Sequence, residues 1–446
     1  MKYNIVVIGG GPAGLVCATT ARRNYPDKKI LVIRKVAQGV IPCAIPYIFG
    51  RLGSVDKILM SDSVYSANDI DLLIDTVTKI DPEKRKVTTM SKGDIEFEKL
   101  VIATGAKPSI PPIPGIDLKN VFPIHKDAKY LRGMLEVIQK SSSILIIGGG
   151  FVGAEIADEL ARAGKEVYIV EILPHLLYLN FDDEFCVLAE EELRKKGVEI
   201  FTNTRVEKIK GNGKAEKVVL SNGEEIKVDA VIVATGTKPN VDLAKDAGIE
   251  IGKTGAIKVD EYMRTSHKDI YAIGDCAEKI SFYTRKPVRA MLASIATAEA
   301  RIAGSNLYEL KFVNQIRGTI GIFSTVIGDT VLAAAGFIER SAKNEGFDII
   351  VGKAEVFDRH PAAFPDTKKM ITKLIVSRQG ELILGAEIAG GISVGEMINF
   401  IGLAMENHLT LSKIINTQIG THPLLTPPPT RTSVIMAAID ALSKIR

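Results

Sequence analysis

The chain has 446 residues, of which 46% are hydrophobic and 25% charged, and its formal net charge is +4 at pH 7. This length predicts two to four domains of roughly 100–200 residues each, and the composition is that of a globular protein. The small charge, without any stripe of Lys and Arg, excludes nucleic acid as an expected partner. Because no apolar run reaches the roughly 18 residues of a membrane span, we expect no membrane partner either.

The N-terminus and the cysteines together predict a cytoplasmic protein. The first strand begins at Tyr3, which leaves no room for a signal peptide. The four cysteines are scattered, and none belongs to a Cys-x-x-Cys pair. Such spacing favours a reducing compartment over a disulfide framework, and no residue cluster predicts a metal site.

The first nucleotide-binding signal follows the predicted strand at residues 3–8. Residues 9–14 read Gly-Gly-Gly-Pro-Ala-Gly, and a helical pattern runs from about Leu15 to Arg23. Strand, Gly-x-Gly-x-x-Gly and helix in this order form the dinucleotide fingerprint, in which glycines permit close approach of a pyrophosphate and the helix offers free N–H groups. The candidate cofactor residues of this turn are Gly9, Gly11, Pro12, Ala13 and Gly14. Cys17, on the helix, is interpreted as core.

The second predicted strand, residues 29–33, ends in two cations instead of an acid. An acidic residue normally stands there and binds a ribose hydroxyl. Here Arg34 and Lys35 occupy the position. They indicate either a solvated basic turn or a pair of cations near an adenosine ribose or phosphate, and both interpretations stay open.

A lone cysteine follows, within residues 40–47. Cys43 stands between Pro42 and Pro46. Free cysteines are among the most buried residue types, so one interpretation is core filler. The other is a chemically used thiol.

The glycine pattern recurs 139 residues after its first occurrence. A strand at residues 143–147 leads to Gly-Gly-Gly-Phe-Val-Gly at 148–153, a helix at about 154–163 and a strand at 166–170. The candidates in this turn are Gly148, Gly150, Phe151, Val152 and Gly153. The last strand ends in Glu171, placed to accept from a ribose 2′-hydroxyl, which favours NADH over NADPH because a carboxylate repels a 2′-phosphate.

Two further motifs support two nucleotide-binding units. Residues 100–108 and 231–239 share a strand that runs into an Ala-Thr-Gly turn, which makes Thr104, Gly105 and Gly236 candidates. A strand from Asp269 then ends in Gly274-Asp275, and a helix is predicted from about Val288 to Ala303. Asp275 is interpreted as a ligand for a sugar-like hydroxyl chain, with a helix-capping turn as the alternative.

The last third of the chain predicts an antiparallel sheet followed by helices. The predicted strands are 318–327, 331–338, 348–356, 370–377 and 381–388, and the predicted helices are 394–406, 411–415 and 431–445. Without a phosphate loop or metal cluster, this part is predicted to serve packing or dimerisation.

Together these motifs resemble the flavin-dependent pyridine nucleotide–disulfide oxidoreductases, and within them the branch of NADH oxidases, NADH peroxidases and coenzyme A-disulfide reductases. The resemblance covers essentially the whole chain, including the single cysteine with Pro46-Tyr47 three residues on. It implies an α/β fold with two Rossmann-like dinucleotide-binding domains, for FAD and NAD, plus a C-terminal α+β dimerisation domain. The implied boundaries are 1–112 and 244–311 for the discontinuous FAD domain, 113–243 for the NAD(P)H domain and 312–446 for dimerisation.

The resemblance also implies roles for the motif residues. FAD would be held by Gly9, Gly11, Gly14, Thr104, Gly105 and Asp275, with Asp275 at the ribityl chain. NADH would be held by Gly148, Gly150, Gly153, Glu171 and Gly236. Glu155 matches a family acid near the nicotinamide, although a first-turn carboxylate also suits a helix dipole.

The implied chemistry ends at Cys43, which would face the isoalloxazine. Hydride would pass from NADH to the flavin, and the reduced flavin would reduce an oxidised form of this cysteine. Because a single cysteine forms no internal disulfide, its partner is derived from oxygen or is a substrate sulfur.

Three departures narrow the resemblance. Pro12 stands where peroxidases and many oxidases of the branch carry a histidine, which disfavours a peroxidase. Phe364 stands where coenzyme A-disulfide reductases carry a tyrosine. Where a second tyrosine is expected, His422-Pro423 resembles the His-Pro-Thr of glutathione reductase-type enzymes. We therefore hypothesise that His422 transfers protons to Cys43 or the flavin across a dimer interface; the alternative is a surface-loop histidine.

Four functions stay open, with NADH and a second copy of the chain as expected partners. The first is an NADH oxidase-like enzyme with oxygen as acceptor. The second is a coenzyme A-disulfide or polysulfide/sulfur reductase. The third is a ferredoxin/rubredoxin reductase-like electron carrier, for which Cys43 is incidental, and the fourth is a nicotinamide-sensing flavoprotein.

Overall fold

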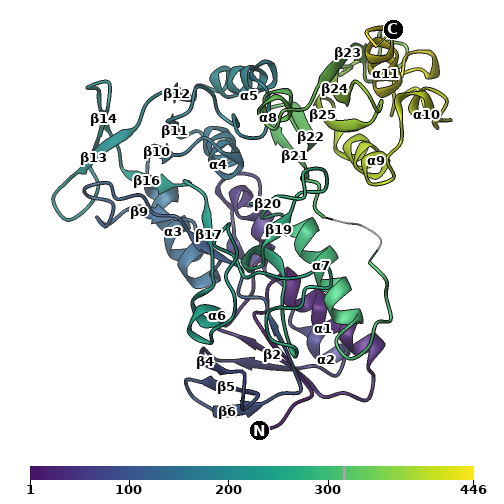
Figure 1. The fold of residues 1–446 in the computed structure, drawn as a ribbon. Coiled ribbons are helices and arrows are strands. Elements are labelled where there is room, and N and C mark those ends of the chain that lie inside the picture. Colours follow the sequence, from purple (N-terminus) through teal and green to yellow (C-terminus); the bar gives the residue numbers. More distant parts are fainter. Residues whose placement is uncertain (315–317, 446) are drawn as a thin grey trace. The chain divides into compact units, whose positions relative to one another are not determined.

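The computed structural model describes residues 1–314 and 318–445, so residues 315–317 and 446 of the predicted C-terminal domain lie outside the described part. The chain divides into two compact units, coloured along the sequence in Figure 1. Unit 1 comprises Met1–Ile110, Pro123–Gln139 and Gly236–Thr319, and unit 2 comprises Pro111–Phe122, Lys140–Thr235 and Ile320–Arg446. Each unit is described by itself.

Unit 1 is built on a five-stranded sheet of order β18-β7-β1-β2-β3, in which all neighbours are parallel. Its strands are β1 (Ile5–Ile8), β2 (Ile30–Arg34), β3 (Asp71–Ile74), β7 (Lys99–Ile102) and β18 (Ile270–Ala272). Every residue of β1 is buried, as expected for a parallel strand covered on both faces. This sheet confirms the predicted α/β class.

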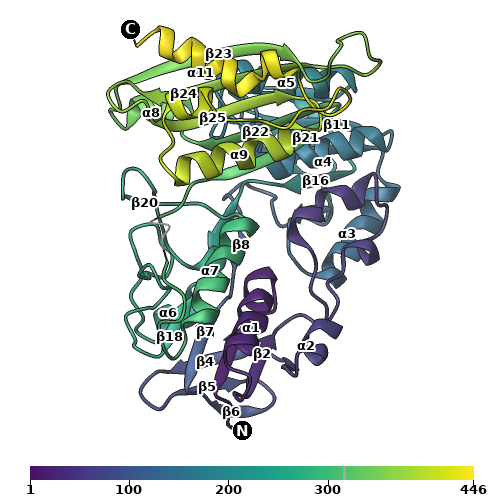
Figure 2. The same cartoon turned by 90° about the vertical axis from the view of Figure 1, so that its right-hand side faces the viewer.

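Helices α1 (Pro12–Asn24) and α7 (Ala293–Ser305) lie side by side against one face of this sheet, as Figure 2 shows. Small buried residues let the two helices approach closely, among them Ala21 and Ala300. The opposite face packs against a three-stranded sheet of β4 (Val77–Asp81), β5 (Lys86–Thr89) and β6 (Gly93–Glu96), and against α6 (Asp242–Asp246). No sequence pattern predicted this small sheet.

The predicted helix from Val288 is wrong at its start. Pro287–Val288 forms the short strand β20, which pairs with β19 (Lys279–Ile280), and α7 begins only at Ala293. Leu292, the residue before the helix, is extended. Pairing across a hairpin therefore overrides the helical pattern of the first residues.

Unit 2 contains the second parallel sheet, of order β12-β11-β10-β16-β9. Its strands are β9 (Val121–Pro123), β10 (Ser143–Ile147), β11 (Glu166–Val170), β12 (Glu199–Phe201) and β16 (Ala230–Val233). Helices α4 (Phe151–Arg162) and α5 (Asp183–Lys195) belong to this part, as does a small sheet of β13 (Val206–Lys210), β14 (Lys217–Leu220) and β15 (Glu225–Lys227). The bounds of β10 and β11 are those that the sequence predicts.

The rest of unit 2 is an antiparallel sheet of order β21-β22-β25-β24-β23, as predicted. Its strands are β21 (Ile322–Ile327), β22 (Thr330–Gly336), β23 (Ile349–Phe357), β24 (Lys369–Ser377) and β25 (Ile383–Gly390). Helices α9 (Val394–Glu406), α10 (Leu411–Ile415) and α11 (Ser433–Ser443) follow, and α9 and α11 pack on the sheet. Among the described residues, no helix is long and apolar enough to cross a bilayer.

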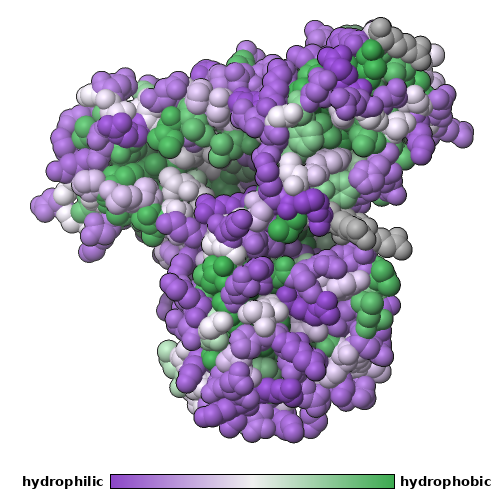
Figure 3. All heavy atoms as spheres, in the orientation of Figure 1, coloured by the Kyte–Doolittle hydropathy of each residue, from purple (hydrophilic) through white to green (hydrophobic). Residues whose placement is uncertain are grey.

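Apolar side chains are exposed on this C-terminal part, and Figure 3 shows green patches there. They lie on several elements, with exposed fractions of 86% for Ile392, 60% for Leu403 and 65% for Leu425. Apolar groups that stay in contact with water are costly, so a surface of this kind favours burial against another protein.

A buried lysine joins α5 to the antiparallel sheet within unit 2. Lys373 on β24 is 2% exposed, and its Nζ lies 2.8 Å from Asp182, 2.9 Å from Glu184 and 2.9 Å from Glu339. Burial raises the pKa of Asp182, but hydrogen bonds from Glu387 and Lys373 outweigh it and bring that pKa to about 2. Burial raises the pKa of Glu387 to about 9, so this carboxyl is neutral at pH 7. One lysine thus holds three ionised carboxylates and one neutral carboxyl.

Lys373→Met should lower the free energy of unfolding by about 3–5 kcal/mol, because it leaves buried carboxylates without their cation. Lys353→Met is the matched control, since Lys353 donates to the same Glu184 oxygen from a position 55% exposed, and it should cost about 1 kcal/mol or less. Urea unfolding of both variants measures the difference. Equal losses would contradict the role given to Lys373.

Candidate functional site

The first glycine turn connects β1 to α1 and leaves an open place for a ligand. Gly9 has φ +116°, and a side chain there would overlap the carbonyl of Ala103, directly after the neighbouring strand β7. A side chain on Gly14 would overlap the carbonyl of Gly9, which fixes close packing of α1. Gly11 is different, because a Cβ there meets no atom within 4 Å. This open side of the turn, at the N-terminus of a 13-residue helix, fits a pyrophosphate.

Arg34 packs against this turn at Gly10. Its side chain is 4% exposed, forms two bonds of 2.7 Å with the Asp62 carboxylate and occupies the place that a side chain on Gly10 would take. It also donates to the carbonyls of Val36 and Ala37 in the segment that leads to Cys43. Of the two cations in the predicted basic turn, Arg34 is buried and Lys35 is exposed. A contact of either cation with adenosine stays a prediction.

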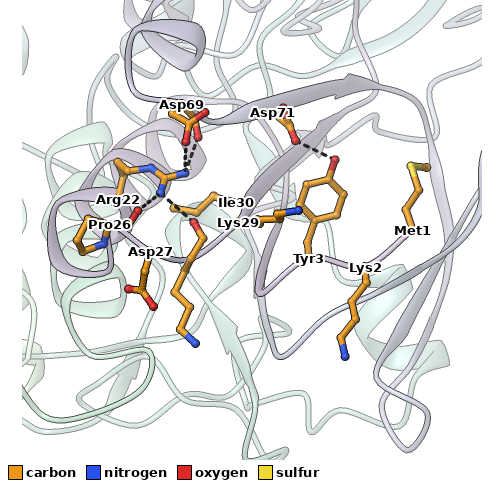
Figure 4. A pocket seen from close by; sticks show the side chains of 11 residues that line it. Met1, Lys2, Tyr3, Arg22, Pro26, Asp27, Lys29, Ile30, Asp69 and Asp71 are labelled. Atoms are coloured by element: carbon orange, nitrogen blue, oxygen red, sulfur yellow. Dashed lines mark hydrogen bonds and ion pairs between the residues drawn. The ribbon is translucent and has the colours of Figure 1, made fainter.

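A polar crevice of about 520 Å³ in unit 1 lies away from this turn. Figure 4 shows its lining, which includes Tyr3, Arg22 and Asp71. Tyr3, Ile30 and Asp71 stand where β1, β2 and β3 begin, whereas nucleotides bind at the carboxyl ends of parallel strands. The guanidinium of Arg22 is bonded to the carbonyls of Asn68, Asp69, Pro26 and Lys28, which gives it a structural role.

The segments that follow the two Ala-Thr-Gly repeats pair in unit 1. Strands β8 (Ala106–Pro108) and β17 (Thr237–Pro239) pair antiparallel. The Thr104 hydroxyl donates to the Asn240 carbonyl at 2.6 Å, and the Asn240 N–H donates to Gly105 at 2.9 Å. Gly105 and Gly236 both have positive φ, which explains the repeated glycine. The two repeats are therefore joined through the short strands that follow their turns. The motifs alone did not predict this pairing.

The Gly274-Asp275 turn lies directly after β18. It forms the 3₁₀ helix η4 (Gly274–Cys276), in which Gly274 has φ +73°. The Asp275 carboxylate is 18% exposed and lies 3.0 Å from Lys126 Nζ. A partly exposed carboxylate at the carboxyl end of a parallel strand is suited to bind a sugar hydroxyl.

In the second glycine turn, Glu171 accepts the backbone N–H of Gly149 at 2.6 Å and that of Leu173 at 2.8 Å. Gly148 has φ +106°, and a Cβ on Gly150 would meet no atom within 4 Å. Unit 2 therefore repeats the open turn of unit 1. The acid that the sequence placed at the ribose also fixes the turn.

Glu155, one turn into α4, is bonded by a residue that the sequence did not indicate. Thr325 on β21 donates to its carboxylate at 2.7 Å. Burial raises the pKa of Glu155 to about 7, although the Thr325 hydrogen bond lowers it. Phe151, at the start of the same helix, packs edge-to-face on Phe323 with ring centroids 5.0 Å apart. Val152, next to it, is 39% exposed.

Cys43 is the exposed cysteine of this chain. It lies in the 3₁₀ helix η1 (Pro42–Ala44), whereas Cys17, Cys186 and Cys276 are buried. Burial raises the pKa of Cys17 and of Cys186 to about 12, so both stay thiols at neutral pH. The core interpretation of Cys17 is confirmed, and the filler interpretation of Cys43 is wrong because its side chain faces solvent.

His422 lies in an exposed loop that a second histidine supports. The His360 N–H donates to the carbonyl of Pro423 at 3.0 Å, and His360 Nδ1 lies 2.9 Å from the carbonyl of Thr426. His422 Nδ1 accepts the N–H of Leu424 at 3.3 Å. The structure thus brings together the two segments in which the sequence departs from the coenzyme A-disulfide reductases.

Several residues that bond the candidate site were not predicted from the sequence. Asp62, Lys126 and Thr325 stand 28, 149 and 170 residues from the side chains that they bind. No motif signals such distant pairs. Among the described residues, no group of three or more His, Cys, Asp or Glu could hold a metal.

Comparison with protein families gives two matches that together cover most of the chain. Residues 3–300 match the pyridine nucleotide-disulphide oxidoreductase family. Residues 322–431 match the dimerisation domain that carries the same family description.

Individual relatives carry two kinds of name. The chain is 33% identical to an NADH oxidase of Methanocaldococcus jannaschii, over 99% of both chains. It is 34% identical to an NAD(P)H coenzyme A polysulfide/persulfide reductase of Pyrococcus horikoshii, over 87% of this chain and 88% of the relative. Among solved structures, an NAD-dependent persulfide reductase from A. fulgidus matches with a TM-score of 0.92 and 33% identity, over 100% of this chain and 83% of that one.

Glu155 makes the stability of the chain depend on pH. In the folded chain its carboxyl keeps its proton up to about pH 7, whereas an ordinary glutamate loses it near 4.5. The stabilisation is therefore complete below pH 4.5 and is lost as the pH rises toward 7. Glu155→Gln should reduce this loss by up to roughly 3 kcal/mol, measured by urea unfolding across this pH range.

Thr325→Val tests whether the pKa of Glu155 causes this pH dependence. Removing the hydroxyl that lowers the pKa of Glu155 should extend the loss to higher pH. Parallel stability profiles of the wild type and both variants would contradict the assignment.

Proposed function

Because this chain belongs to the pyridine nucleotide–disulphide oxidoreductase family, a family of flavin- and NAD(P)H-using enzymes, we propose that it is an FAD-dependent oxidoreductase that passes hydride from NADH to Cys43 and on to a small sulfur acceptor or oxygen. The observation that carries the proposal is the exposure of Cys43, alone among four cysteines. It supports a thiol that reacts, since buried thiols of raised pKa are inert.

FAD would be bound by the first glycine turn and by Asp275. The open side of Gly11 has room for the pyrophosphate, and the Asp275 carboxylate would accept a ribityl hydroxyl. Thr104 and Gly105 would line the same site. We assign residues 1–112 and 244–311 to the FAD domain.

The nicotinamide dinucleotide would be bound by the second glycine turn, in a domain of residues 113–243. Glu171 would accept a ribose hydroxyl while its bonds to Gly149 and Leu173 hold it in place. Because a carboxylate repels a 2′-phosphate, NADH is favoured over NADPH. Comparing kcat/KM for the two nucleotides tests this, and a preference for NADPH would contradict it.

With a sulfur acceptor, the Cys43 thiolate attacks the acceptor's S–S bond. A bond from Cys43 to one sulfur forms as the S–S bond breaks, and the first thiolate leaves and takes up a proton. When bound, FAD would take the hydride from NADH and supply its two electrons to the Cys43 sulfur. The mixed disulfide is thereby cleaved, which releases the second thiol, restores the Cys43 thiolate and leaves NAD⁺. With oxygen, the oxidised form of Cys43 would be a sulfenic acid.

Two observations favour a sulfur acceptor. An exposed thiol lets an S–S bond approach in line, whereas oxygen needs no exposed thiol to react with a reduced flavin. Arg51, also exposed, lies over the Tyr47 ring at 5.7 Å, and a cation in this segment favours anionic polysulfides and persulfides. A relative named NADH oxidase supports oxygen as the second candidate.

A second copy of the chain would complete the site. Residues 322–431 match a dimerisation domain, and Leu403 and Leu425 are among the apolar residues exposed there. We assign residues 312–446 to dimerisation and propose a homodimer in the cytoplasm. His422 would then donate protons to the leaving thiolate in the partner's site.

Cys43→Ser tests the central step. Reduction of bound flavin by NADH, followed by stopped-flow absorbance, should persist, while turnover with coenzyme A disulfide or polysulfide should fall to background. Cys186→Ala, which removes a buried sulfur, should keep both activities. Full turnover of Cys43→Ser with every acceptor would favour an electron carrier of the ferredoxin reductase kind.

Thiol trapping and mass spectrometry then identify the acceptor. A sulfur or coenzyme A adduct on Cys43 of the turning-over enzyme supports the sulfur acceptor. A sulfenic acid together with oxygen consumption supports the oxidase.

His422→Ala should lower turnover by about 10²–10⁴-fold, the range for loss of a general acid. His267→Ala serves as the control, because His267 is far from His422 in sequence and belongs to unit 1, whereas His422 belongs to unit 2. An unchanged rate and pH profile in His422→Ala would end this role.

A further inference from the structure

An ion pair is buried beneath the Gly274-Asp275 turn of unit 1. Lys279 of β19 and Glu299 of α7 have exposed side-chain fractions of 3% and 8%, and Lys279 Nζ lies 2.8 Å from Glu299 Oε1. None of the motifs indicated either residue.

Both charges bind the backbone of that one turn. The Gly274 N–H donates to Glu299 Oε2 at 2.8 Å. Lys279 Nζ donates to the carbonyl of Gly274 at 2.8 Å and to that of Ala277 at 2.9 Å. The start and the end of the turn that carries Asp275 are thus held by side chains from two different elements.

Stability alone does not account for this pair. Ionised groups lose their hydration on burial, and replacing a buried pair by apolar side chains of similar volume is often neutral or stabilising. The surroundings would suit such side chains, since Ile273, Ala296 and Ala300 are all buried. What apolar side chains would not supply is the set of three bonds to the backbone of the turn.

Backbone bonds also constrain the turn, since the Ala277 N–H donates to the Gly274 carbonyl at 2.9 Å and the Ile257 N–H to the Cys276 carbonyl at 2.8 Å. The two buried side chains add bonds at Gly274, the residue directly before Asp275. Gly274 has φ +73°, a conformation open to glycine but with no preference for this one geometry. On the outer side, Asp275 is bonded by Lys126, whose side chain is 39% exposed and competes with water. Lys279 and Glu299 thus bond the backbone on both sides of Asp275, at Gly274 and at Ala277.

We propose that Lys279 and Glu299 are positioning residues for the flavin, which set its affinity by fixing the turn that presents Asp275 to the ribityl chain. This inference rests on the proposed binding of FAD. Neither residue touches the cofactor in this role; both act through the backbone of residues 274–277.

The double variant Lys279→Met/Glu299→Leu separates positioning from stability. If the pair is only structural, removing both charges together restores stability and leaves FAD binding intact. If it positions the turn, the apoprotein unfolds in urea much as the wild type does, while the Kd for FAD, measured by flavin fluorescence quenching, rises about tenfold or more. The visible spectrum of the bound flavin should also shift, since its surroundings change.

Lys99→Met is the matched control. Lys99 pairs with Asp269 at 2.6 Å, at the opposite end of β18 from the Gly274 turn. Losing that pair should leave the Kd for FAD unchanged. Glu299→Gln decides the matter if the double variant does not fold, because it removes the charge and keeps the side-chain shape.

The outcomes are distinguishable. A wild-type chain that binds no FAD overturns the proposed function. A wild-type chain that binds FAD, with a Kd in the folded variants less than about threefold higher, overturns the positioning role alone. A larger rise, absent from Lys99→Met, supports it.

Discussion

Both glycine turns depend on a charged residue at the end of the strand that follows the helix of the turn. In unit 2, Glu171 accepts the N–H of Gly149; in unit 1, Arg34 fills the space beside Gly10 and bonds Asp62. A glycine-rich turn has many accessible conformations, and a ligand that must order it binds more weakly. A buried charge against the turn removes this cost before the ligand arrives. Arg34 and Glu171 carry opposite charges, and each constrains its glycine turn through different contacts.

Buried charge is used in the same way elsewhere in the chain. Lys373 lies beside carboxylates from α5 and α8 (Glu339–Asn344) and a neutral carboxyl from β25, while Lys279 and Glu299 bond one turn. In each case a long flexible side chain is immobilised by several bonds at once, so its orientation is defined by elements distant in sequence. Hydrophobic packing fills the cores of both units but does not by itself aim a particular carbonyl or N–H. The charged residues supply that direction.

The sequence predicts the parts of this molecule whose signals are local. Strand, glycine turn and helix follow one another within about thirty residues, so both parallel sheets were predicted, and β10 and β11 with their observed bounds. Alternation along each strand likewise predicted the antiparallel sheet. The start of α7 was missed because β20 forms by pairing with β19, an event that helical periodicity does not register. The small sheet of β4, β5 and β6 was missed because its strands are short and half exposed.

For the candidate site too, residues with local sequence signals could be predicted and the others could not. The residues of both glycine turns, Asp275 and Cys43 could be named from spacing and resemblance. The side chains that bond Arg34, Glu155 and the Asp275 turn could not be named. Asp62, Lys126, Thr325 and Glu299 come from segments that the fold brings near, and Lys279 follows the turn closely but belongs to no motif. The uneven burial of the four cysteines has a practical consequence for work with this protein. Since three sulfurs are shielded, a dye, spin label or cross-linker added to the folded chain will attach at one position. The native sequence can therefore be labelled site-specifically, with no cysteine removed, at the very atom whose redox state is of interest.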